Sequence, residues 1–263
     1  MKVPKKPTQT APEAATAAPE LRKHFDSSDE LCEYMAAQSD GCALLAFSTG
    51  KDSIAAWLKM RRYFRKIVPY YLYCMPGLEF VEHSLEYYED WFGCHIIRMP
   101  HPSLYRWLRE FIFQAPENLS IIENARLAKF DDGDVCRLIR QTDPELANAY
   151  QATGVRSADS IVRRQTMMKH GQVNHKTMKF YPVFDYKKED MVRELEASEI
   201  ALPIDYEWFG RSFDGLDYRF TSVLKEKAPR DYARLQEAFP LLELDSLRMQ
   251  YRKEYHTRGG IAL

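Results

Sequence analysis

The sequence predicts an α/β protein in which helices cover both faces of a parallel sheet. Short runs rich in β-forming residues alternate along the chain with amphipathic segments, and the links between them are short. This alternation is the pattern that right-handed crossovers between parallel strands produce. At 263 residues and 45% apolar content, the chain can bury one substantial core, so a single α/β unit accounts for its length.

Composition argues against several classes of protein. The net charge of -1 does not fit a chain built mainly to coat nucleic acid, although it is compatible with a local basic patch. No run is apolar enough to span a membrane, and we expect neither a membrane span nor a signal peptide. We expect a reducing, cytoplasmic setting and no iron–sulfur cluster, because the five cysteines are scattered; they are Cys32, Cys42, Cys74, Cys94 and Cys136.

Residues 1–23 are rich in proline, alanine and threonine and offer almost nothing to bury, which predicts a disordered tail. A solubilising extension is favoured over an arm that binds nucleic acid. The basic residues of the tail are Lys2, Lys5, Lys6, Arg22 and Lys23. The capping pattern of Ser27–Glu30 then predicts a helix that runs to about Gln38 and ends at Asp40-Gly41.

The first predicted strand leads into a loop that suits a phosphate group. Residues 43–47 form an apolar run, and the apolar positions within Ile54–Leu58 have the spacing of an amphipathic helix. The polar turn Ser48–Ser53 therefore lies at a helix N-terminus, where unpaired N–H groups and the helix dipole attract anions. Its hydroxyls and the Lys51 ammonium add donors. The spacing of its glycine matches neither a Walker A loop nor the dinucleotide-binding fingerprint.

A second strand is expected over residues 66–75 and ends in the turn Pro76–Phe80. Ligands of parallel sheets bind beyond the carboxyl ends of the strands, where this turn and the Ser48 loop both fall. Residues 114–134 are polar and mixed, which predicts an insertion or a lid. The other expected elements are helices over 81–92, over 104–113 after His101-Pro102, over 135–139 with Cys136, over 188–198 and within 218–256 over the sheet edge, and strands over 95–99 and 149–153.

A basic segment follows the strand expected at 149–153. If a helix begins near Ser157, then Arg156, Ser160 and Arg163 share one face at its start. Such a face suits phosphate or sulfate oxygens, which arginine can hold through two parallel hydrogen bonds. A solvated basic face, with Asp159 simply paired to Arg163, is the alternative.

These segments together resemble the phosphoadenosine phosphosulfate (PAPS) reductase-like family of pyrophosphate-loop (PP-loop) ATP pyrophosphatases. The turn Ser48–Ser53 has the family's Ser-x-Gly-Lys-Asp-Ser form. Gly77-Leu78-Glu79-Phe80 stands where the family has a Gly-x-Glu-Phe-type turn near the adenosine. Residues Gly154–Arg163 are similar to its Gly-x-Arg-x-x-Glu-Ser-x-x-Arg element, with Asp159 in place of the glutamate.

The resemblance covers about residues 41–215. Lys179–Phe184 with Asp185 resembles the family's fifth strand and acidic turn, and Gly210–Leu216 takes the place of a Gly-x-x-Ser-x-Gly-Cys-type segment, with Leu216 replacing the cysteine. The implied fold is the adenine-nucleotide α-hydrolase-like (Rossmann-like) sandwich with a C-terminal helical extension. The expected division is a tail at 1–23, a PP-loop nucleotide-binding domain at 24–216 and a helical segment at 217–263 packed on the same domain.

The resemblance implies binding of ATP or of PAPS. The catalytic residues that it implies are Lys51, Asp52, Arg156 and Arg163, which would neutralise phosphoryl charge and orient the loop, and Asp52 would also help to hold Mg²⁺. The residues implied in nucleotide binding are Ser48, Thr49, Gly50, Lys51, Asp52, Ser53, Gly77, Glu79, Gly154, Arg156 and Ser160.

The predicted function is activation of an unknown acceptor by adenylylation with release of pyrophosphate, as in sulfur insertion into a nucleic acid or a small molecule. One alternative is reduction of PAPS or sulfotransfer. It needs a thiolate, which the family supplies from its C-terminal segment, whereas this chain has no cysteine after Cys136. Another alternative is a nucleotide-sensing protein without turnover, in a complex with a nucleic acid or protein partner.

Overall fold

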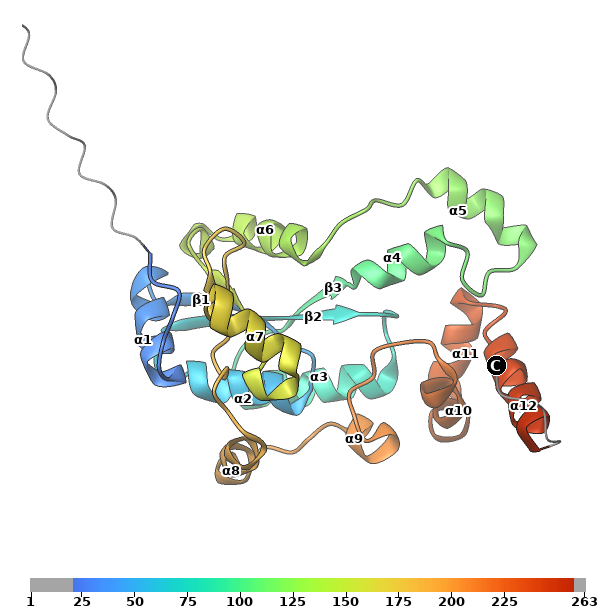
Figure 1. The fold of residues 1–263 in the computed structure, drawn as a ribbon. Helices are drawn as coiled ribbons and strands as arrows, with labels where there is room; N and C mark the ends of the chain where they lie inside the picture. Colours follow the sequence, from blue (N-terminus) through green and yellow to red (C-terminus); the bar gives the residue numbers. More distant parts are fainter. Residues whose placement is uncertain (1–20, 258–263) are drawn as a thin grey trace, which may run out of the picture.

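A six-stranded sheet forms the centre of the structure, a computed structural model that describes residues 21–257 (Figure 1). The strands are β1 (Cys42–Ala46), β2 (Lys66–Tyr73), β3 (Ile97–Pro100), β4 (Tyr150–Ala152), β5 (Val173–Asn174) and β6 (Lys179–Phe180). They lie in the order β3-β2-β1-β4-β6-β5, and every neighbouring pair is parallel except β5 and β6. The predicted α/β fold class is confirmed.

Helices cover both faces of this sheet. They are α1 (Ser28–Gln38), α2 (Lys51–Met60), α3 (Glu79–Phe92), α4 (Pro102–Arg109), α5 (Leu119–Ala125), α6 (Asp132–Thr142), α7 (Ile161–His170), α8 (Lys188–Ser198), α9 (Ile204–Phe209), α10 (Tyr218–Lys227), α11 (Pro229–Ala238) and α12 (Glu243–Thr257). Alternate residues of β1 point to opposite faces, so Ala43 and Leu45 join the larger core while Cys42 and Leu44 join a smaller one under α6. Figure 1 shows α6 on one side of the sheet and α2, α3 and α8 on the other.

Local interactions set the ends of the elements that the sequence predicts well. Ser27 Oγ accepts the N–H of Glu30 at 3.2 Å, and α1 begins at the next residue after Ser27. The Glu30 carboxylate accepts from the N–H of Asp26, one residue before the capping serine. Helix α8 has the predicted bounds. Of the predicted tail, Lys2, Lys5 and Lys6 lie outside the described residues, and Arg22 and Lys23 are exposed.

Several segments differ from their prediction, among them the helix expected over 104–113, which forms as α4 over Pro102–Arg109. The strand expected at 179–184 ends as β6 after two residues, because Pro182 has no N–H for a ladder and the chain turns there, with the Phe184 N–H bonded to the Tyr181 carbonyl. The short strand β5 was not predicted. Helix α3 begins at Glu79, two residues before its predicted start. Residues 114–134 carry a short 3-10 turn and α5, and no residue of α5 is buried.

The C-terminal helices pack at the carboxyl end of the sheet rather than over its lateral edge. The Asp231 carboxylate of α11 accepts the N–H groups of Glu79 at 2.7 Å and Phe80 at 3.2 Å, which caps α3 from a distant part of the chain. The Leu241 N–H bonds to the Phe113 carbonyl beyond α4. Figure 1 shows α10, α11 and α12 together at this end of the molecule. Within residues 21–257, no helix has the length and apolar character needed to cross a membrane.

Candidate functional site

The Ser48 loop lies at the topological switch point of the sheet, where strands that follow in the sequence pair with opposite sides of β1. From β1 the chain proceeds to β2 and β3 on one side, while β4 pairs with the other side of β1. The carboxyl ends of β1 and β4 therefore border a crevice of the kind in which α/β proteins bind ligands. The loop connects β1 to α2 across this crevice, as the sequence predicts.

Hydrogen bonds hold the loop in a compact form. The Ser53 hydroxyl donates to the Gly50 carbonyl at 2.8 Å and accepts the Ser48 N–H at 3.2 Å. Thr49 has a φ of 56°, a left-handed conformation that β-branched residues rarely adopt, and its hydroxyl donates to the Ser48 carbonyl. The side chains of Thr49 and Ser53 are thus occupied in shaping the loop.

This shape leaves backbone donors free at the start of α2. Among the described residues, the N–H groups of Thr49, Gly50 and Asp52 have no hydrogen-bond acceptor. The Lys51 N–H is bonded, to the Tyr206 hydroxyl of α9 at 3.1 Å. Helix α2 is ten residues long, so its dipole adds positive potential at the same place. The N-terminus of α2 therefore offers donors that suit an anion in its backbone as well as in its side chains.

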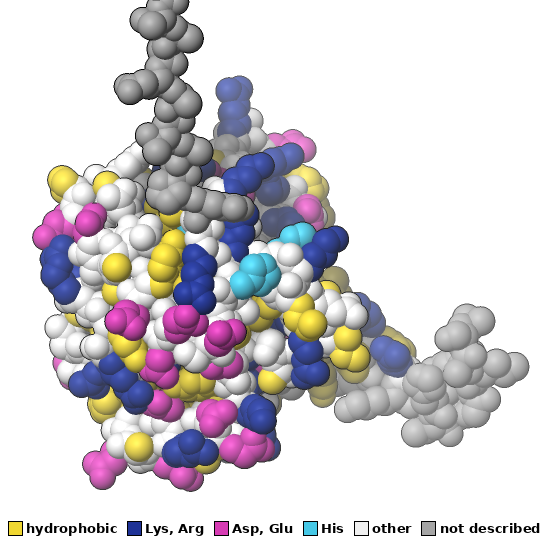
Figure 2. All heavy atoms as spheres, turned by 60° about the vertical axis from the view of Figure 1, so that its left-hand side comes forward, with side chains coloured by type: hydrophobic (Ala, Val, Ile, Leu, Met, Phe, Trp, Pro, Cys, Tyr) yellow, Lys and Arg dark blue, Asp and Glu magenta, His cyan; other side chains and the backbone are white. Residues whose placement is uncertain are grey.

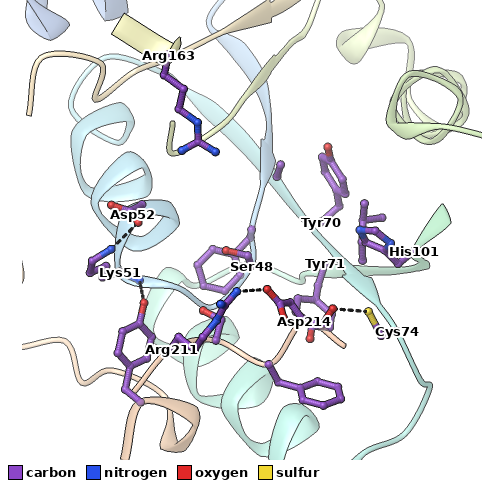
Figure 3. A pocket seen from close by; sticks show the side chains of 16 residues that line it. Ser48, Lys51, Asp52, Tyr70, Tyr71, Cys74, His101, Arg163, Arg211 and Asp214 are labelled. Atoms are coloured by element: carbon purple, nitrogen blue, oxygen red, sulfur yellow. Dashed lines mark hydrogen bonds and ion pairs between the residues drawn. The ribbon is translucent and has the colours of Figure 1, made fainter. Parts of the chain in front are cut away.

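A pocket of about 630 Å³ opens beside the loop, over the carboxyl ends of β1 and β2 (Figure 3). Its volume lies within the usual range for small-molecule sites. Besides the loop, it is lined by residues at the ends of β2 and β3, by one residue of α7 and by α9 with the segment after it: Tyr70, Tyr71, Leu72, Cys74, His101, Arg163, Tyr206, Arg211, Ser212, Phe213 and Asp214.

Each cation of the pocket has an acidic partner. Lys51 Nζ lies 2.7 Å from Asp52 Oδ2, and Arg211 is paired with Asp214. Arg163, which reaches towards the pocket in Figure 3, lies 2.7 Å from an Asp159 oxygen. All three ion pairs are partly exposed, so a ligand anion can replace the acidic partner of each cation at a low cost in free energy.

Arg156 lies beside the pocket but does not line it. Its guanidinium is buried, with Nη2 2.8 Å from Asp159 Oδ1 and Nε 3.0 Å from Asp52 Oδ1. The contact with Asp52 has the distance of an ion pair but not the angles of a hydrogen bond, so both atoms are buried without a hydrogen-bond partner. Burial would raise the pKa of Asp159, but the Arg156 N–H and the guanidiniums of Arg156 and Arg163 outweigh it and lower that pKa. Arg156 therefore positions Asp52 and the chain after β4.

The expectation of one helix face with Arg156, Ser160 and Arg163 is wrong. A 3-10 turn (Ser157–Asp159) comes first, and Ser160 is extended with a φ of -163°. The Ser160 hydroxyl accepts the Arg163 N–H at 3.1 Å and so caps α7. The predicted alternative, a pair between Asp159 and Arg163, is present. The break in the helix separates a buried arginine from one that reaches the pocket.

Gly154 supports the site through packing. A Cβ atom at this position would lie 2.6 Å from the carbonyl group of Asp52 and 2.9 Å from the Ser53 nitrogen. Glycine is therefore required for the chain after β4 to touch the first turn of α2. Gly50 is crowded as well, because its Cβ would lie 2.8 Å from Ser212 Oγ.

Gly77 and Glu79 are not brought to this pocket. Gly77 has a φ of 68°, and its carbonyl accepts a hydrogen bond from Arg234. Glu79 lies in the first turn of α3, and its carboxylate is 3.7 Å from Arg230. Both residues face the C-terminal helices, which cover the turn after β2.

Asp52 offers little to a metal ion in this arrangement, because Lys51 and Arg156 flank its two carboxylate oxygens. Among residues 21–257, no group of three or more His, Cys, Asp or Glu side chains is arranged to hold a metal ion. A magnesium ion that enters with a nucleotide is carried mainly by the phosphates. Asp52 is better suited to orient the two cations beside it.

Most residues that line the pocket were not predicted from the sequence, among them Cys74, His101, Tyr206 and Arg211. Cys74 and His101 directly follow β2 and β3, so their position at the carboxyl end of a strand was the available signal. Burial raises the pKa of the Cys74 thiol to about 12, and its sulfur lies 3.7 Å from the Asp214 carbonyl oxygen. Burial lowers the pKa of His101, whose Nδ1 accepts the Ser103 N–H at 3.0 Å.

Cys136 does not belong to the pocket. It is buried in the smaller core beneath α6, where its thiol lies 3.4 Å from the Tyr70 hydroxyl. Burial raises its pKa, which keeps the thiol protonated. This buried position makes Cys136 a structural thiol of the smaller core.

Comparisons with known proteins give low similarity only. NH3-dependent NAD synthetase from Campylobacter jejuni subsp. jejuni NCTC 11168, in complex with the nitrate ion, has 12% sequence identity and a TM-score of 0.42, over 90% of this chain and 97% of that one. U34-tRNA thiolase NcsA from Methanococcus maripaludis, with its 4Fe–4S cluster, has 13% identity and a TM-score of 0.39, over 80% of this chain and 76% of that one. No family model and no curated protein matches the chain. Function is therefore argued from the residues of the site.

Proposed function

We propose that this protein binds ATP with its phosphates on the Ser48–Ser53 loop and activates an acceptor by adenylylation. The observation that carries this proposal is the set of free N–H groups of Thr49, Gly50 and Asp52 at the start of α2, next to Lys51 and a 630 Å³ pocket. Backbone N–H groups at a helix N-terminus hold phosphate oxygens without any specific side chain. Tyr71, Leu72 and Phe213 provide an apolar surface for the base and ribose.

The reaction needs no nucleophile from the protein. An acceptor oxygen forms a bond to the α-phosphorus while the bond from that phosphorus to the bridging oxygen breaks, and the electron pair leaves with pyrophosphate. Lys51, Arg163 and Arg211 surround the pocket and would offset the charge that develops on the phosphoryl oxygens. Each such contact is worth about 3 kcal/mol of transition-state stabilisation when water is excluded.

PAPS reduction is a second candidate because Cys74 lies in the pocket. The Cys74 thiolate would bond to the sulfur of the phosphosulfate while the bond from that sulfur to the bridging oxygen breaks and adenosine 3′,5′-bisphosphate leaves. A second thiol would then be needed to release sulfite. The pKa of about 12 weighs against this candidate, because the thiolate is the nucleophile and Cys74 is protonated at neutral pH. No cation is paired with the Cys74 sulfur among the described residues.

The test is isothermal titration with ATP–Mg²⁺ and, separately, with PAPS, followed by assay of the same samples for pyrophosphate and sulfite. We expect ATP to bind and pyrophosphate to be released slowly without the true acceptor. Lys51→Ala should weaken ATP binding about 10- to 100-fold, because a charge-assisted contact is lost. Lys188→Ala is the matched control, since this exposed lysine lies on α8 outside the pocket.

Each of the other possible results of these titrations and assays leads to a different conclusion. Sulfite release from PAPS that is lost in Cys74→Ser would replace the adenylylation proposal by the reductase one. Binding of ATP with no pyrophosphate under any condition would favour a nucleotide sensor. Binding of neither nucleotide would overturn the proposed function.

A further inference from the structure

A second cavity adjoins the nucleotide pocket and shares one residue with it. This groove of about 810 Å³ lies between α6 and the turn of the β5–β6 hairpin, and His101 lines both it and the pocket of Figure 3. The carboxylates of Asp132 in the groove and Asp214 in the pocket both act electrostatically on His101. His101 is therefore the boundary between the two cavities. We call the second one the α6 groove.

Charge is unevenly distributed along the α6 groove. Asp131 and Asp132 lie at the first turn of α6, at the end that also holds His101. Four cations line the rest of the groove, namely Arg137, Arg140, Lys176 and Lys179. On α6, Arg140 comes eight residues after Asp132, which is a distance of about 12 Å along the helix axis. One end of the groove can thus accept hydrogen bonds and the other can hold an anion.

Most of this positive charge has no partner. Among the described residues, Lys176 and Lys179 make no ion pair. Arg140 Nε donates to the Ala149 carbonyl at 2.7 Å, but its Nη2 is buried without a hydrogen-bond partner. Arg137 alone is paired, at 2.7 Å from Asp134. In Figure 2, several Lys and Arg side chains lie together in the upper right part of the face shown, whereas acidic side chains are more frequent in its lower half. The buried guanidinium nitrogen of Arg140 and the two lysines therefore give this part of the groove donors that can bind an anion.

We propose that the α6 groove binds the acceptor, and that the acceptor is a phosphate-bearing molecule with its phosphate at Lys176, Lys179 and Arg140 and its reactive end at His101. This inference rests on the proposed adenylylation in the adjoining pocket. Because Nδ1 of His101 accepts a backbone N–H, the neutral ring carries its proton on Nε2 and presents a donor. Asp132 presents an acceptor at the same end. An acceptor with N–H or O–H groups beside a reactive oxygen satisfies both.

The phosphate could come from a nucleic-acid strand or from a small phosphate ester, and two probes separate these sources. One is a fluorescein-labelled single-stranded oligonucleotide, measured by anisotropy over a range of salt concentrations. The other is uridine 5′-monophosphate, measured by titration. The variant is Lys176→Gln/Lys179→Gln, and Lys187→Gln/Lys188→Gln is its charge-matched control on the exposed start of α8.

We expect one of the two probes to bind the native protein and the groove variant to bind it at least 10-fold more weakly, with the control unchanged. For the oligonucleotide, the slope of log affinity against log salt should fall by about 1.4, because two phosphate contacts are lost. Oligonucleotide binding alone identifies a strand, and binding of the monophosphate identifies a small ester. Failure of both probes, or equal binding by the two variants, overturns the proposal.

ATP titration of the same variants keeps this result separate from the proposed function. The groove variant should bind ATP as the native protein does, because Lys176 and Lys179 do not line the nucleotide pocket. If the native protein does not bind ATP, the proposed nucleotide site is refuted. Phosphate binding in the α6 groove would still be measured by anisotropy or titration.

Discussion

The Tyr206 hydroxyl accepts a hydrogen bond from the backbone N–H of Lys51, at 3.1 Å. This N–H is one of the donors at the start of α2 that a phosphate would use. Ser212, from the segment after α9, also approaches the loop, since a Cβ on Gly50 would lie 2.8 Å from its hydroxyl. A part of the chain remote from the loop thus places oxygen atoms beside the donors at the start of α2.

Removal of the Tyr206 hydroxyl should strengthen nucleotide binding. In Tyr206→Phe the Lys51 N–H has no internal acceptor, so a phosphate oxygen no longer competes with the phenol. One hydrogen bond is worth about 1 kcal/mol net, and we expect the ATP dissociation constant to fall about 5-fold in a titration. Tyr87→Phe is the control, because the Tyr87 hydroxyl also accepts a backbone N–H, from Ala201, outside the pocket. Weaker binding by Tyr206→Phe would show that the phenol contacts the nucleotide directly.

Gly154→Ala should damage both stability and binding. Its Cβ would lie 2.6 Å from backbone atoms of Asp52, so the first turn of α2 must move. Overpacking of this kind costs about 2 kcal/mol, which denaturant unfolding can measure, and we expect weaker ATP binding as well. Gly215→Ala should be neutral in both measurements, since its nearest neighbour is 3.9 Å away. A neutral Gly154→Ala would contradict the close approach of the chain after β4 to the first turn of α2.

Asp231 should tie the C-terminal helices to the stability of α3. Its buried carboxylate accepts the N–H groups of Glu79 and Phe80, and Asp231→Ala leaves both without a partner. We expect the free energy of unfolding to fall by about 2 kcal/mol. Asp231→Asn retains one acceptor oxygen and should lose less. Equal stability of the native protein and Asp231→Ala would mean that water replaces the carboxylate.

Asp159 should make stability depend on acid pH. The pKa of Asp159 in the folded protein lies below the reference value of 3.8. Its contribution to the free energy of unfolding is therefore complete above pH 3.8 and is lost as the pH falls through the folded pKa. At pH 7, Asp159→Asn should be about 2 kcal/mol less stable, because buried Arg156 loses one of its two acidic partners.

The stability difference between the native protein and Asp159→Asn should narrow below about pH 4, as measured by urea unfolding at a series of pH values. Glu226→Gln is the surface control and should change stability by less than about 0.5 kcal/mol at every pH. A difference that stays constant from pH 7 to pH 3 would exclude the ionised Asp159 as the cause.

Sequence reasoning failed where a local pattern had more than one solution. The spacing of Arg156, Ser160 and Arg163 fits a helix face, but serine also caps helices when its backbone is extended, and Ser160 does so. The sequence contains both possibilities. Packing of Gly154 against α2 and the burial of Arg156 decide between them.

The sequence by itself determined the alternation of strands and helices, the position of the Ser48–Ser53 loop and the bounds of α8, because these depend on residues a few positions apart. Only the tertiary structure decided that Tyr206 and Arg211 join the loop, that Asp231 caps α3, and that His101 separates two cavities. These contacts join residues far apart in the chain, and the entropy lost in bringing them together is offset only when the whole core forms.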